Sequence, residues 1–183
     1  MKPLVKHEAQ IKIEKISAFK NADLSDICDA TESTILDNTD SFSIGYNRSE
    51  PLARERLEVY WKGVLLVPQR ELIVGRIDGT IASSVQLIKP HPNNQTSGFA
   101  ARVEQHFVAP WARGHGLAKE LLSAVEKEAK IGGFSVLRLS VGENLTSAIK
   151  LYEAKGFKKW GTLDKYELVD GKMTAGHYYY KDL

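Results

Sequence analysis

The stretch best suited to chemistry joins an apolar strand to a strongly amphipathic helix and runs from Phe107 to Ala118. It contains Arg113, Gly114 and Gly116 just before the helix. The start of a helix leaves about four backbone N–H groups without partners, and the macrodipole adds roughly half a positive charge there. Glycines let an anion approach the backbone closely, and an arginine adds forked donors. This spacing predicts a site for a phosphate or diphosphate.

A plain glycine-rich turn into a helix is the alternative for this stretch, and it stays open. Two nucleotide-binding motifs fit less well. The dinucleotide fingerprint G-x-G-x-x-G requires a glycine where this chain has Lys119. It also requires an acidic ribose partner about 20 residues later, where Ser135 and Val136 stand. The P-loop pattern G-x-x-x-x-G-K-S/T is not supplied by Gly114 to Lys119.

Hydrophobic periodicity and turn residues predict the elements that position this stretch. Strands are expected over 10–16, 71–77, 80–88, 98–108, 135–141, 157–167 and 173–180. A first helix is expected from a cap at Asn21 or Asp23 to Ile35. A second helix is expected to start after an N-cap at Ser49, with Pro51 in its first turn. Two more helices are expected over 115–131 and 146–155. Residues 37–48 are expected to form a loop. The dipeptides Asp78-Gly79 and Asp170-Gly171 predict hairpin turns. The strand–helix–strand unit over 98–141 predicts two parallel strands within a mixed sheet.

Length and composition indicate one ordinary globular domain over 1–183, with 1–9 as a flexible tail. A net charge of +2 gives no reason to expect a nucleic-acid partner. The single cysteine, Cys28, excludes an internal disulfide framework. His106 and His115 have no third ligand in pattern, so no metal is expected. The chain begins without a secretory signal, and its longest clean apolar run, 64–67, is far too short to cross a bilayer. A cytoplasmic protein is expected, with the nucleus left open.

Two motifs resemble those of a known family. Residues 113–118 match the signature Q/R-x-x-G-x-G/A of the GNAT acetyltransferases, and 108–110 match its usual V-x-P. About 30 residues later, 143–157 look like the family's E-N-x-x-A-I/R-x-L-Y-x-x-x-G-F block. The resemblance implies an α/β (mixed α+β) fold. Its centre is a mixed, mostly antiparallel sheet of six to seven strands with a parallel βαβ unit, flanked by about four helices.

The resemblance also implies a co-substrate, acetyl-CoA, held in a notch where two parallel strands splay. Its diphosphate lies against the amides of Arg113, Gly114, His115, Gly116, Leu117 and Ala118. Backbone groups of Phe107 and Val108 pair with the pantetheine arm, and the amide of Val108 holds the developing oxyanion. Asn144 touches the same arm. Tyr152 protonates the leaving thiolate, a step that is feasible but weakly driven, since a thiol has a pKa near 8.5 and a phenol near 10. The alternative for Tyr152 is a core tyrosine.

The base that deprotonates the acceptor amine is less clear. Some polyamine-directed relatives carry a glutamate where this chain has Glu104, which is the expected base here; a solvent-facing carboxylate is the alternative. Other relatives have an acid where this chain has Arg102 or Ser140. A water chain ending at Glu104, Gln105 or His106 stays open. Gln105 and Trp61 are expected to touch the acceptor, with core packing as the alternative for Trp61.

The expected activity is acetyl transfer from acetyl-CoA to an amine by direct attack in a ternary complex. A small-molecule amine is the expected acceptor, because the chain shows no added recognition module and no strongly charged patch. A protein N-terminus or lysine is the alternative acceptor. A non-catalytic CoA-binding sensor and a nucleotide-binding domain are the alternatives from other classes. The chain is compatible with a homodimer.

Overall fold

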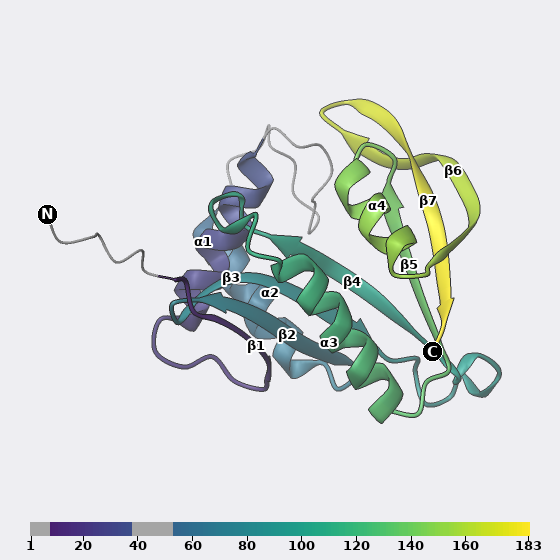
Figure 1. Ribbon diagram of the computed structural model, residues 1–183, viewed down its shortest axis with the longest axis horizontal. Helices are drawn as coiled ribbons and strands as arrows, with labels where there is room; N and C mark the ends of the chain where they lie inside the picture. Colours follow the sequence, from purple (N-terminus) through teal and green to yellow (C-terminus); the bar gives the residue numbers. More distant parts are fainter. Residues whose placement is uncertain (1–7, 38–52) are drawn as a thin grey trace, which may run out of the picture.

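The computed structural model describes residues 8–37 and 53–183 (Figure 1). Seven strands are present in the described part: β1 Ile11–Ile16, β2 Arg70–Ile77, β3 Thr80–Ile88, β4 Ala100–Val108, β5 Val136–Gly142, β6 Lys158–Val169 and β7 Lys172–Asp182. The α-helices are α1 Asp23–Leu36, α2 Arg54–Leu66, α3 Leu117–Ile131 and α4 Thr146–Ala154. Short 3₁₀ turns, η1 Gln95–Ser97 and η2 Pro110–Ala112, flank β4. The expected mixed fold and its number of helices are confirmed.

One sheet contains all seven strands in the order β1-β2-β3-β4-β5-β7-β6. Neighbours are antiparallel except β4 and β5, which run parallel as predicted. The parallel ladder is short: Ala100 pairs with Val136, Ala101 with Leu137 and Arg102 with Arg138. Within the described residues the ladder stops there, so the two strands diverge toward their carboxyl ends. This divergence makes room for the candidate site.

A different pair of helices packs on each face of the sheet. On one face, α1 and α2 supply Ile27, Leu57 and Trp61 to a core that includes alternate residues of β2, such as Leu72 and Val74. The other face receives residues from α3 and α4, and Ile73 points to that side. This alternation follows from the two-residue period of a strand. In Figure 1, α3 crosses in front of the sheet and α4 lies beside β5.

The predicted hairpin turns are confirmed. Asp78 and Gly79 have φ values of 50° and 88°, and Asp170 and Gly171 have 48° and 77°. Positive φ at both central residues defines the turn whose twist matches that of the flanking strands. The two hairpins therefore set the registers of β2 with β3 and of β6 with β7.

The start of α2 differs from the expected one. The helix begins at Arg54, after Ala53, rather than after an N-cap at Ser49. Contacts with α1 fix this first turn instead of a local cap, because the Arg54 guanidinium contacts the carboxylate of Asp29 at 2.5 Å and Ser25 at 2.9 and 3.0 Å. Ser49 and Pro51 lie outside the described residues. So do most of the expected loop at 37–48 and most of the expected tail at 1–9.

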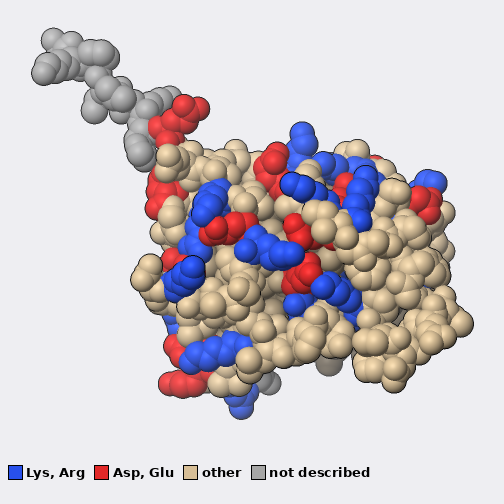
Figure 2. All heavy atoms as spheres, turned by 90° about the horizontal axis from the view of Figure 1, so that it is seen from below, with Lys and Arg blue, Asp and Glu red and all other residues tan. Residues whose placement is uncertain are grey.

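The surface carries mixed charge. Figure 2 shows Lys and Arg interspersed with Asp and Glu on the face in view. Charged side chains are also paired with one another in the described residues, for example Lys15 with Glu128 and Arg76 with both Glu14 and Asp23. None of the described helices is both long and apolar enough to span a bilayer.

Candidate active site

The junction between β4 and α3 has the backbone that an anion site requires. After η2, Arg113 is extended, and Gly114 and Gly116 take positive φ values of 85° and 79°. Gly116 precedes the first helical residue, the buried Leu117. The first amides of α3 have no partner inside the helix, because only the amide of Glu120 reaches back to the carbonyl of Gly116. The residues that carry these amides, Gly116 to Lys119, line a hollow.

That hollow, which we call the cleft, has a volume of about 500 Å³. It lies between the end of β4, the junction and the start of α4. The expected co-substrate residues that line it are Phe107, Val108, Arg113, Gly114, Gly116, Leu117, Ala118 and Asn144. His115 is the exception, since it does not line the cleft and its Nδ1 lies 3.2 Å from the carbonyl oxygen of Ala112. Residues from three elements thus meet around one cavity.

The backbone of Val108 is oriented toward the divergence of β4 and β5. The amide of the next residue, Ala109, donates to the carbonyl of Ala82 in β3 at 2.8 Å. Because successive amides of an extended chain point to opposite sides, the amide of Val108 points away from β3. On that side β5 has already separated from β4. This amide is therefore placed to donate to a ligand in the cleft.

A second cavity, the splay pocket, fills the gap between the diverging strands. Its volume is about 260 Å³, and it is lined by 103–106 of β4, 139–142 of β5, Leu145, Tyr152, Tyr166 and Glu167. Glu104, Gln105 and Tyr152, all expected site residues, line it together. His106 and Leu145 line both the splay pocket and the cleft, so the two cavities meet there.

A bulge in β4 shapes this meeting point. Ser84 pairs with Phe107 and Gln86 with Glu104, so Gln105 and His106 lie opposite a single residue of β3. Gln105 has a φ of 50°, which is unusual for a residue other than glycine. Such a bulge redirects side chains, and here it places Gln105 on the splay pocket and His106 between the two cavities.

His106 holds the hydroxyl of Tyr152. Its Nε2 lies 2.9 Å from the carbonyl oxygen of Ala118, and its Nδ1 lies 3.0 Å from the Tyr152 hydroxyl. A carbonyl oxygen can only accept, so Nε2 carries the proton and Nδ1 accepts the hydrogen bond from Tyr152. Burial lowers the pKa of His106 to about 4, which keeps the ring neutral at pH 7. Burial also raises the pKa of Tyr152, so its phenol keeps its proton.

Comparison with known proteins identifies the family. The sequence profile of the acetyltransferase (GNAT) family matches residues 34–157. An uncharacterised N-acetyltransferase of Azospirillum brasilense is 49% identical over 133 residues, which cover 73% of this chain and 76% of that protein. The chain belongs to the GNAT family. It is an N-acetyltransferase.

Solved structures share the fold of this acetyltransferase at low identity. An N-acetyltransferase from Staphylococcus aureus superposes with a TM-score of 0.76 at 20% identity, covering 94% of this chain and 98% of that one. A protein of Salmonella typhimurium, solved with its cofactor acetyl-CoA, gives a TM-score of 0.72 at 15% identity and covers 94% of each chain.

Glu104 of the acetyltransferase is paired with two arginines. One carboxylate oxygen lies 3.3 Å from Arg70, and the other lies 3.2 Å from Arg102. Arg70 also donates to the side-chain oxygen of Gln86 at 2.7 Å, and Gln86 donates to the hydroxyl of Tyr60 at 3.2 Å. Both oxygens of this carboxylate therefore already have guanidinium partners.

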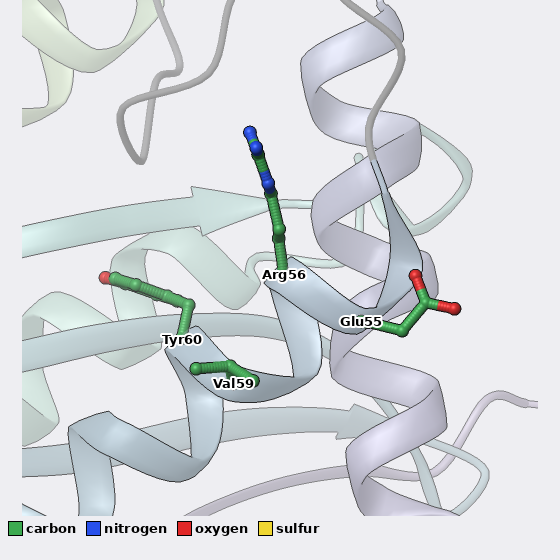
Figure 3. Close-up of a pocket in the computed structure, with 4 residues that line it drawn as sticks. All are labelled: Glu55, Arg56, Val59 and Tyr60. Carbon is green, nitrogen blue, oxygen red and sulfur yellow. The ribbon is translucent and has the colours of Figure 1, made fainter.

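Trp61 lies in the core of the acetyltransferase. Its side chain is fully buried, and its indole N–H donates to the hydroxyl of Thr31 at 3.1 Å. In this structure it lines neither the cleft nor the splay pocket and has no surface to offer an acceptor. The neighbouring Tyr60 and Val59 instead line a hollow on the outer side of α2 with Glu55 and Arg56 (Figure 3). One helix supplies all four of these side chains, and no other element of the described residues contributes to the lining of this hollow.

Four side chains around the site were missed by sequence reasoning or make contacts that it did not predict. Tyr166 and Glu167 of β6 line the splay pocket, and Ser140 joins them through a 2.8 Å hydrogen bond with the Tyr166 hydroxyl. Arg113, expected to bind the diphosphate, pairs with Asp37 at the end of α1 over 2.6 Å. Among the described residues, no group of three His, Cys, Asp or Glu side chains could hold a metal ion.

Proposed function

We propose that this chain transfers an acetyl group from acetyl-CoA to a small-molecule amine by direct attack in a ternary complex. The observation that carries the proposal is the junction of the two cavities at His106 and Leu145. One cavity offers helix-start amides and Arg113 to a diphosphate, and the other offers carboxylates to an amine. A thioester at the junction of the two cavities would be joined to a diphosphate in the cleft and would be accessible to an amine in the splay pocket.

Different residues along the cleft bind different parts of acetyl-CoA. The amides of 113–118 bind the diphosphate, and the backbone of Phe107 and Val108 pairs with the pantetheine arm together with Asn144. The outward amide of Val108 polarises the thioester carbonyl and stabilises the charge that develops on its oxygen. Tyr152 gives its proton to the departing thiolate.

Direct attack is supported by the state of the one cysteine. Cys28 is buried in α1, and burial raises the pKa of its thiol to about 11. The reactive form of cysteine is the thiolate, which is therefore scarce at neutral pH. Cys28 lines neither the cleft nor the splay pocket. Tyr152, by contrast, lines the splay pocket in its protonated form, as an acid requires.

Calorimetry and a thiol-release assay test the proposal. CoA and acetyl-CoA should bind the full chain with measurable heat, and acetyl-CoA with a panel of small amines should release CoA thiol only when an amine is present. Binding of CoA without turnover of small amines, peptides or lysine-containing proteins would support a non-catalytic sensor. Turnover of peptides alone would move the acceptor to a protein amine. Binding of NAD or ATP in place of CoA would overturn the assignment of the cleft.

A further inference from the structure

A bulge in β6 turns two side chains into the splay pocket. Leu163 pairs with Gly176 and Glu167 pairs with Thr174, so residues 164–166 lie opposite Ala175 alone. The ring of Tyr166 lies directly over Gly176, where a Cβ would approach the ring to 2.2 Å. Only glycine leaves room for this ring. The bulge brings the Tyr166 hydroxyl to Ser140 of β5 and Glu167 to the lining of the pocket.

The carboxylate of Glu167 is in an unusual position. Its Oε2 is buried and has no hydrogen-bond partner among the described residues. Burial raises the pKa of Glu167, which makes it a stronger base than an ordinary glutamate. A buried carboxylate oxygen without a partner is costly, so its position on a cavity points to a ligand that donates a hydrogen bond to it. Glu104, across the same pocket, already has two arginines.

The other groups facing Glu167 do not supply a counter-charge. His106 of β4 is neutral, Tyr152 of α4 and Tyr166 of β6 are protonated phenols, and Ser140 of β5 is a hydroxyl. Glu104 is the remaining charged side chain among those that line the pocket, and it too is an anion. A ligand that fits this set carries a positive charge and hydrogen-bond donors, as an alkylammonium does. The volume of about 260 Å³ favours a compact one.

We propose that Glu167 binds the ammonium group of a compact aliphatic amine in the splay pocket and takes the proton that this amine must lose before it attacks. This inference rests on the proposed acetyl transfer. The ammonium gives one proton to the Glu167 carboxylate, and the freed nitrogen lone pair forms a bond to the thioester carbon. The C–S bond breaks, and the thiolate receives the proton of Tyr152. The nitrogen loses its second proton, which restores the Tyr152 phenol, and Glu167 releases its own proton to solvent.

The test compares Glu167→Gln with the wild-type chain and with Asp164→Asn. Asp164 is an exposed carboxylate in the same bulge, so its variant removes the same charge outside the pocket. With acetyl-CoA and a panel of aliphatic mono- and diamines, Glu167→Gln should lower kcat/KM by about 100-fold or more at pH 7. Its Kd for acetyl-CoA should stay within twofold of wild type, and Asp164→Asn should keep full activity.

A pH profile separates a proton acceptor from a structural role. Toward pH values of about 10, which approach the ordinary amine pKa of about 10.4, the fraction of free amine rises several hundred-fold over that at pH 7, so Glu167→Gln should recover most of the lost activity. A defect caused by misfolding would not recover. Glu167→Asp, which withdraws the carboxylate by one methylene, provides a second variant and should keep activity between those of Glu167→Gln and wild type.

Several outcomes would overturn the inference. One is a Glu167→Gln variant within threefold of wild type at pH 7. Another is a wild-type chain that binds acetyl-CoA but acetylates none of the small amines, or acetylates peptides alone. Both leave the cleft assignment standing. If the wild-type chain binds no acetyl-CoA, the proposed function itself fails, and the inference fails with it.

Discussion

The hydroxyl of Tyr152 on α4 donates a hydrogen bond to Nδ1 of His106 on β4 over 3.0 Å. The opposite ring nitrogen of His106 donates to the carbonyl of Ala118 in the first turn of α3. The phenol is thus fixed at the junction of the cleft and the splay pocket by a ring that is itself anchored to the helix start. His106 can therefore affect the rate without contacting the reacting atoms, because it positions the Tyr152 hydroxyl, the group proposed to protonate the thiolate.

Removing the phenol should affect chemistry more than binding. Tyr152→Phe should lower kcat by about 100-fold and leave the Kd for acetyl-CoA within twofold, because the ring and its packing are kept. His106→Phe should lower kcat by about tenfold, since the hydroxyl remains but loses its anchor. The double variant should be no slower than Tyr152→Phe, because the two residues act as a unit. Steady-state kinetics measures all three, and losses that simply multiply would contradict this positioning role.

His106 should make the free energy of unfolding depend on pH in a defined window. Its pKa is lowered from 6.5 to about 4 in the folded chain, so the unfolded chain binds a proton first as pH falls. The free energy of unfolding should therefore fall between pH 6.5 and 4 by about 3 kcal/mol from this residue. Glu167, whose pKa is raised, has the opposite effect: above the ordinary pKa of glutamate, it lowers the free energy of unfolding as pH rises.

Chemical denaturation across this range checks the expectation. In His106→Gln the slope between pH 6.5 and 4 should be much smaller than in wild type, whereas the steeper loss below pH 4 should remain. That lower range reflects Asp23 and Glu14, whose pKa values are lowered by hydrogen bonds to Arg76 and, for Glu14, first to Lys12. Equal slopes for both proteins would show that His106 is not the titrating group.

The features set by local sequence were predictable. The glycines at 114 and 116 require positive φ, and the turn dipeptides at 78–79 and 170–171 fix their hairpins. The apolar stripe of α3 determines which face it buries, so the amino-acid pattern alone locates the glycine-rich start of this helix. These are short-range properties, in which neighbouring residues decide the outcome.

The composition of the splay pocket was not predictable in the same way. Glu167 reaches it only because the bulge in β6 forms over Gly176, a packing relation between two strands. The arginines that pair with Glu104 come from β2 and β4, so these two ion pairs could not be predicted together from the sequence around it. Trp61 shares an apolar stripe with Tyr60, but only the packing of α2 on β2 and α1 decides which ring is fully buried.

The left-handed backbone of Gly116 should be needed for CoA binding. Gly116→Ala adds a Cβ that meets no protein atom within 4 Å and, since Gly116 lines the cleft, takes up space there. We expect the Kd for CoA to rise at least 30-fold by calorimetry. Gly133→Ala is the matched control, because Gly133 has a φ of +80°, equally open surroundings and a place at the other end of α3.

Both glycine variants should lose about 1 kcal/mol of stability, the cost of left-handed backbone for alanine. Only Gly116→Ala should lose CoA affinity. The comparison therefore distinguishes the effect of backbone strain, which both variants share, from the loss of contact with the ligand. Equal affinities in the two variants would remove the diphosphate from this helix start.

Arg113 should contribute a charge to CoA binding that Asp37 partly masks. The two side chains lie 2.6 Å apart, and Arg113 is 45% exposed, so this ion pair is worth at most about 1 kcal/mol. A diphosphate offers a stronger partner for a guanidinium. Arg113→Ala should therefore weaken CoA binding by about tenfold or more, with a smaller effect at high salt.

Asp37→Asn should have the opposite effect if the carboxylate competes with the diphosphate for Arg113. Removing the competitor should tighten CoA binding by about threefold at low salt, a gain limited by the small worth of an exposed ion pair. The gain in affinity should vanish in the Arg113→Ala background, because there is then no guanidinium for the Asp37 carboxylate to hold. Calorimetry on the four proteins measures the coupling directly. A weaker affinity in Asp37→Asn would instead mean that Asp37 holds Arg113 in its binding position, and the ion pair would then be part of the site rather than a competitor for it.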